Sequence, residues 1–197
     1  MASDLRPGPD SPPTNELASA EAALSVLQQV LHTIAGDDMS RPTPCREYDV
    51  SGLTGHLLNS ITVLGGMAGA DFAGPSANDD TASVEGQVIG AARPALDAWH
   101  RRGIDGDVSL GPGSMPARVA VSVFSIEFLV HAWDYATAVG HDMQAPDSLT
   151  DYVLGLARTL IKPQERSAAG FDEPVEVPEH ASGLHRLVAF TGRNPTR

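Results

Sequence analysis

The chain has 197 residues, and 42% of them are hydrophobic, which suits one globular domain with a core of its own. Thirteen Lys and Arg stand against 25 Asp and Glu, so the net charge is −12. Such a surface repels phosphate backbones and anionic lipid headgroups, and we expect neither nucleic acid nor a membrane as a partner.

The single cysteine, Cys45, cannot form an internal disulfide, which is typical of a reducing compartment. The first residues lack the basic and apolar regions of a signal peptide. The longest apolar stretch, residues 119–133, is interrupted by Glu127 and His131. These features predict a cytoplasmic protein without a membrane span.

Residues 1–13 hold four of the 15 prolines and are expected to be a disordered lead-in to a single domain over 14–197. From Thr14 to Gly36, apolar residues recur with the spacing of a helix. After the proline-rich loop 41–48, either Asp49 or Ser51 can cap a second helix that ends before Gly65. The inner face of that helix carries Leu53, His56, Leu57, Ser60 and Leu64.

A third helix is expected over about 81–101 and a fourth from Pro116 to about 139, stopped by Gly140. The glycine-rich stretch 103–113 between them predicts a turn-rich crossover without a core element. Asp147 is expected to cap a fifth helix, followed by a short extended piece near Val175 and a last short helix. The pattern predicts an all-α fold, a four-helix bundle with accessory helices.

The fourth helix carries the most informative residues. It is apolar nearly all round over 123–133, so it is expected to be buried on most sides. Glu127 and His131 are four residues apart and share one face. A buried carboxylate is costly unless it is paired, hydrogen-bonded or bound to a metal. With His56 from the second helix, they form a two-histidine, one-carboxylate set that suits Zn, Fe, Ni or Mn and leaves positions open.

Other interpretations of these residues stay open. A structural bundle without metal would hydrogen-bond Glu127 directly to His131. Asp134 can orient a ligand histidine or form an ordinary salt bridge. Cys45 can be a nucleophile or ligand, although a packed thiol is favoured because only Arg46 lies near it in sequence. His141 can be a substitute ligand or a plain helix-end residue.

Two motifs and the ending carry a family resemblance. Residues 41–57, Arg-Pro-Thr-Pro-Cys-Arg-Glu-Tyr-Asp-Val-Ser-Gly-Leu-Thr-Gly-His-Leu, resemble the mycothiol-dependent maleylpyruvate isomerase N-terminal family, which belongs with the DinB-like metal-binding bundles common in actinobacteria. Residues 127–136 look like its second motif, and residues 187–195 are similar to its usual closing segment. The likeness covers roughly residues 15–195, with Tyr48 where relatives commonly carry Trp.

The resemblance implies a DinB-like four-helix bundle in which His56, Glu127 and His131 are the metal ligands. It also implies a divalent metal, with Zn²⁺ favoured and Ni²⁺, Fe²⁺ or Mn²⁺ as alternatives. The implied activity is a metal-dependent reaction of a small-molecule thiol, usually mycothiol, with an electrophilic substrate. The alternative is a non-catalytic metal-binding or stress-response interaction protein. An apolar flank of the first helix would suit a homodimer.

Overall fold

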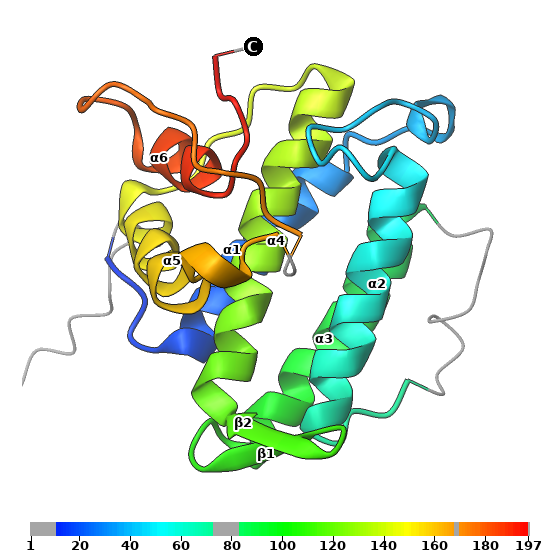
Figure 1. Cartoon of the computed structure of the whole chain (residues 1–197). Helices are drawn as coiled ribbons and strands as arrows, with labels where there is room; N and C mark the ends of the chain where they lie inside the picture. The colour runs from blue at the N-terminus through cyan, green and yellow to red at the C-terminus, as the bar shows by residue number, and fades with distance from the viewer. Residues whose placement is uncertain (1–10, 73–82, 168–169, 197) are drawn as a thin grey trace, which may run out of the picture.

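The computed structural model describes residues 11–72, 83–167 and 170–196, so residues 1–10 of the predicted lead-in lie outside it. The described chain is mostly helical, which confirms the predicted all-α class (Figure 1). Its elements are α1 (Glu16–Leu31), α2 (Val50–Met67), α3 (Val84–Arg102), β1 (Asp107–Leu110), β2 (Gly113–Pro116), α4 (Ala117–Val139), α5 (Asp147–Leu160) and α6 (Gly183–Phe190), with short 3₁₀ turns at Gly36–Asp38 and Pro163–Glu165.

Helix α4 lies at the centre of the fold (Figure 1). It packs against α1, α2 and α5, while α3 packs against α1 and α2, and α6 covers α5. The core is one continuous cluster of buried apolar side chains, and its largest members include Trp99, Phe124, Phe128 and Tyr135. By length and composition alone, α4 is a candidate for crossing a membrane, but 83% of its apolar window is buried inside the protein, as in an ordinary core helix.

The helix ends follow the predicted capping chemistry in two places that matter for the site. Asp49, rather than Ser51, caps α2, because its carboxylate accepts the Gly52 N–H at 2.8 Å. Gly140 ends α4 with φ +71°, a left-handed conformation that glycine adopts without steric cost. The predicted end of the fourth helix at Val139 is therefore confirmed, and its start lies at Ala117, with Pro116 as the preceding cap residue.

Helix α2 is longer than the sequence predicts, because it continues through Gly65 to Met67. A Cβ at Gly65 would lie 2.7 Å from the Cβ of Ala95 on α3. The glycine therefore allows the two helices to approach closely, and it does not mark a helix end. Helix α1, in contrast, is shorter than predicted and ends at Leu31.

Residues 107–116 differ from the prediction of a turn-rich crossover without a core element over 103–113. They form an antiparallel hairpin in which Val108 faces Met115, and Val108 is buried. Asp147 is the first residue of α5 rather than its cap, and its carboxylate accepts the Gly183 N–H at 3.4 Å instead. The extended piece near Val175 forms no strand, although the Val175 N–H donates to Ala189 O at 2.9 Å.

Candidate metal centre

The three residues that the sequence singles out as ligands lie together in the structure. His56 comes from α2, and Glu127 and His131 come from adjacent turns of α4. One nitrogen or oxygen atom of each side chain lies within 4.8 Å of the other two. Leu53 and Leu57 are fully buried, and they hold the His56 side of α2 against α4.

Glu127 stands between the two histidines and is only 13% exposed. Its Oε2 atom lies 3.2 Å from Nε2 of His56 and 3.7 Å from Nε2 of His131. Both contacts are ion pairs, and by donor and acceptor geometry this buried oxygen accepts no regular hydrogen bond. The direct hydrogen bond between Glu127 and His131 that a metal-free structural pair would show is absent.

The charges of the cluster stabilise one another. Burial alone would raise the pKa of Glu127, but the interaction with His56 and the positive potential of both histidines outweigh it and lower the pKa. The same interaction with Glu127 raises the pKa of His56 despite its partial burial. The site therefore favours an ionised carboxylate beside positive charge, which is also what a bound divalent cation would provide.

The second ring nitrogen of His131 is held by Asp134, one turn further along α4. Nδ1 of His131 lies 2.9 Å from Oδ2 of Asp134, whose side chain is fully buried. A carboxylate can only accept here, so Nδ1 carries the hydrogen, and Nε2 is the nitrogen that faces Glu127. Burial would raise the pKa of Asp134, but His131 and Arg193 outweigh it and lower the pKa.

Two neighbours of the centre were not identified as contacts by the sequence analysis. Tyr48 stacks on His56 with ring centroids 5.1 Å apart and an angle of 24° between the rings. Arg193 donates to Asp134 at 2.8 Å through Nη2 and at 3.2 Å through Nε. The signals available in the sequence were the family motifs that contain these residues, since spacing cannot relate residues so far apart.

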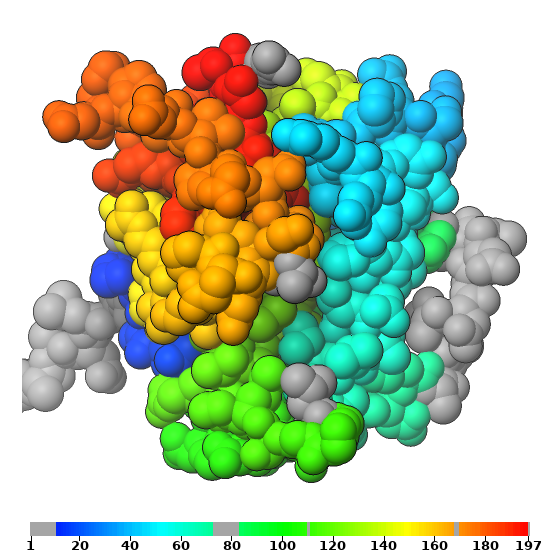
Figure 2. Space-filling view, viewed as in Figure 1, coloured from blue at the N-terminus to red at the C-terminus, as the bar shows by residue number. Residues whose placement is uncertain are grey.

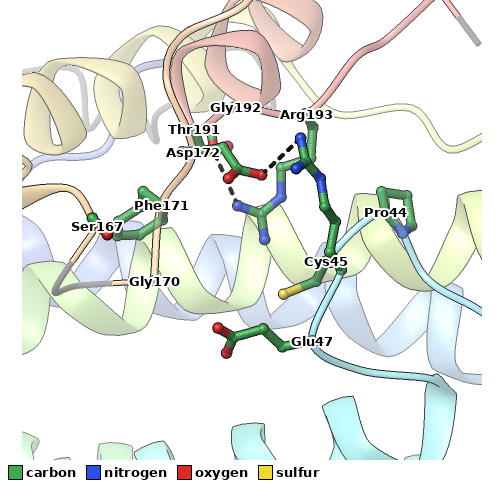
Figure 3. A pocket seen from close by; sticks show the side chains of 11 residues that line it. Pro44, Cys45, Glu47, Ser167, Gly170, Phe171, Asp172, Thr191, Gly192 and Arg193 are labelled. Atoms are coloured by element: carbon green, nitrogen blue, oxygen red, sulfur yellow. Dashed lines mark hydrogen bonds and ion pairs between the residues drawn. The ribbon is translucent and has the colours of Figure 1, made fainter.

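A cavity of about 250 Å³ is lined by Arg193, the partner of Asp134, and by none of the three ligand residues. Figure 3 shows its two walls, with Cys45 and Glu47 on one side and Phe171 and Asp172 on the other. The third lining segment, Thr191 to Arg193, connects the cavity to Asp134. Figure 2 shows the orange surface of residues 163–167 and 170–172 against the light blue to cyan surface of the 41–48 loop.

The remaining candidates lie outside the ligand cluster. Cys45 is half-buried, and burial raises the pKa of its thiol, which fits the favoured interpretation of a packed thiol. His141 is exposed beyond the end of α4. Among the residues that the structure describes, the potential metal-binding group comprises His56, Glu127 and His131 without either of them.

Comparison with known proteins identifies two relatives of this chain, and both are uncharacterized. The chain is 25% identical over 178 residues to two uncharacterized proteins of Mycobacterium tuberculosis, one from strain H37Rv and one from strain CDC 1551. The alignment covers 90% of this chain and 97% of each relative. No family model and no solved structure matches the chain.

Proposed function

We propose that the protein is a divalent-metal-binding, DinB-like four-helix protein with His56, Glu127 and His131 as its ligands. The observation that carries the proposal is the buried Oε2 atom of Glu127, which faces two histidine nitrogens and accepts no regular hydrogen bond. Burying a carboxylate oxygen that accepts no regular hydrogen bond is costly, and a cation between Glu127 and the two histidines would be coordinated by all three side chains. The donor set suits Zn²⁺ and equally fits Ni²⁺, Fe²⁺ or Mn²⁺.

The reaction that we propose is transfer of a small-molecule thiol, with mycothiol as the expected co-substrate, to an electrophilic substrate. A divalent metal lowers the pKa of a thiol bound to it, so a thiolate nucleophile is available at neutral pH. The support for this chemistry is the motif resemblance together with the partial exposure of one ligand, since the His56 side chain is 31% exposed.

The protein's own residues would orient and shield this chemistry. Asp134 fixes the tautomer of His131, and Tyr48 covers one face of His56. The cavity lined by Cys45 and Arg193 offers space for a small molecule next to the residues that hold Asp134. The non-catalytic metal-binding protein stays the alternative, and the motif resemblance is what favours the enzyme over it.

Metal content of the purified protein tests the first part of the proposal. We expect about one divalent ion per chain in the wild type and a large loss in His56→Ala and Glu127→Ala. His141→Ala is the matched control, because this histidine is exposed and lies outside the cluster. A full metal content in both ligand variants would contradict the site assignment.

The second part is tested by the conjugation of a thiol to a reactive electrophile such as a maleimide or a chloronitrobenzene. Metal-loaded wild type is expected to accelerate the reaction above the rate of the metal-free protein, and His131→Ala is expected to abolish the gain. Equal rates with and without metal, for mycothiol and for other small thiols, would favour the non-catalytic alternative.

A further inference from the structure

The closing segment of the chain reaches the proposed metal centre through a buried arginine. Arg193 is 6% exposed and lies three residues after the end of α6. Its side chain donates to both carboxylate oxygens of Asp134 on α4. Asp134 in turn accepts from Nδ1 of His131 at 2.9 Å. The three side chains form a continuous hydrogen-bonded series from the closing segment to a ligand of the centre.

The backbone directs Arg193 into this position. The Arg193 N–H donates to Val188 O at 3.0 Å, and the Gly192 N–H donates to Ala189 O at 3.0 Å. This pair of bonds, with Gly192 at φ +88°, is a Schellman motif that reverses the chain after α6. The residue after the glycine of such a motif turns back toward the helix, and here it is Arg193.

The charges make Asp134 dependent on Arg193. Asp134 is fully buried, and one carboxylate oxygen, Oδ2, is shared between Nη2 of Arg193 and Nδ1 of His131. A buried carboxylate with histidine alone would lack partners for its second oxygen, Oδ1, which Nε of Arg193 contacts at 3.2 Å. The planar guanidinium therefore fixes the plane of the carboxylate, and that plane fixes the His131 ring.

We propose that Arg193 is a positioning residue of the metal centre, acting through Asp134 to hold His131 with Nε2 directed at the ion. This inference rests on the proposed function, because it needs the centre to bind a metal. It makes the closing segment part of the metal site, although the ligands themselves all belong to α2 and α4. The competing explanation is an ion pair that only anchors the closing segment to α4.

Zn²⁺ affinity, measured by competition with a chromogenic chelator, separates the two explanations. Partners that orient ligand histidines typically contribute about 10–100-fold to metal affinity. We expect a loss in this range for Asp134→Asn and for Arg193→Gln, with partial recovery in Arg193→Lys. Arg186→Gln is the matched control, because it removes an exposed Arg–Asp pair with Asp151, at 2.7 Å, from the same part of the chain.

Two further measurements distinguish a positioning role of Arg193 from a general effect on folding. Urea unfolding of each metal-free variant shows whether it is folded, and the visible absorption of bound Co²⁺ reports the geometry around the ion. If Arg193 acts through Asp134, the Asp134→Asn/Arg193→Gln double variant loses no more affinity than Asp134→Asn alone. Additive losses would contradict this route.

Wild-type affinity in a folded Arg193→Gln variant overturns the inference. If that variant does not fold, wild-type affinity in both Asp134→Asn and Arg193→Lys overturns it equally. A wild-type protein that binds neither Zn²⁺ nor Co²⁺ contradicts the proposed function instead, so the two failures are distinguishable.

Discussion

Two Arg–Asp pairs adjoin the same cavity, and they differ in almost every physical property. The Arg193–Asp134 pair is 5% and 0% exposed, with contacts at 2.8 and 3.2 Å. The Arg46–Asp172 pair is 79% and 52% exposed, with its contact at 3.3 Å. The first pair joins the closing segment to α4, and the second joins the 41–48 loop to the segment before α6.

The comparison shows that burial determines what an ion pair can contribute. Water screens the exposed pair, so its members are nearly as stable apart as together. In the buried pair, Arg193 and Asp134 have lost their hydration, and they interact with each other and, for Asp134, with His131 instead. Removing either member therefore leaves a buried charge without its main partner. We therefore expect the buried pair to affect both folding and the proposed metal centre, and the exposed pair to affect neither strongly.

The largest expected effect follows from breaking the buried pair. Arg193→Met leaves the Asp134 carboxylate buried without its cation, which is expected to lower the free energy of unfolding by about 3–5 kcal/mol. Urea denaturation of the metal-free protein measures this change. Arg46→Met is the control for loss of an arginine at the cavity, and equal effects of the two substitutions would contradict the comparison.

The next largest expected effect is the stabilisation of the folded protein by a bound metal ion. Zn²⁺ at 100 times its dissociation constant is expected to stabilise the wild type by about 2.7 kcal/mol, because it binds only the folded chain. Arg46→Met should retain this gain, since its pair does not contact the ligands. His56→Ala should lose it, and thermal unfolding with and without Zn²⁺ measures both. An undiminished gain in His56→Ala would show that the ion binds elsewhere.

Gly192, which precedes Arg193 of the buried pair, is expected not to tolerate a larger side chain. A Cβ at Gly192 would lie 2.5 Å from Cβ of Asp172, at a φ of +88° that other residues rarely adopt. Gly192→Ala is therefore expected to cost about 2 kcal/mol of unfolding free energy. Gly155→Ala, in an exposed part of α5 with nothing within 4 Å, should instead stabilise by roughly 0.5–1 kcal/mol. Chemical denaturation of both variants checks the contrast in sign.

The sequence predicted the part of the site that depends on helix periodicity. Glu127 and His131 share a face because they are four residues apart, and the apolar run around them predicts their burial. The role of Asp134 stayed open in the sequence, since its partner Arg193 lies 59 residues away and is placed by a turn after α6. The hairpin at 107–116 was not predicted, because its strands are short and mostly exposed and are rich in glycine and polar residues. Such strands lack a clear alternation of apolar and polar residues.

The smallest expected effect belongs to the exposed pair itself. Arg46→Gln removes the contact with Asp172 and is expected to change the free energy of unfolding by only about 0–1 kcal/mol. The difference should shrink further in about 1 M salt, where the screening length falls to roughly 3 Å. Urea denaturation of wild type and variant at low and high salt measures it. A loss as large as that of Arg193→Met, unchanged by salt, would mean that the pair supports the folded cavity wall and that exposure is a poor guide to its contribution.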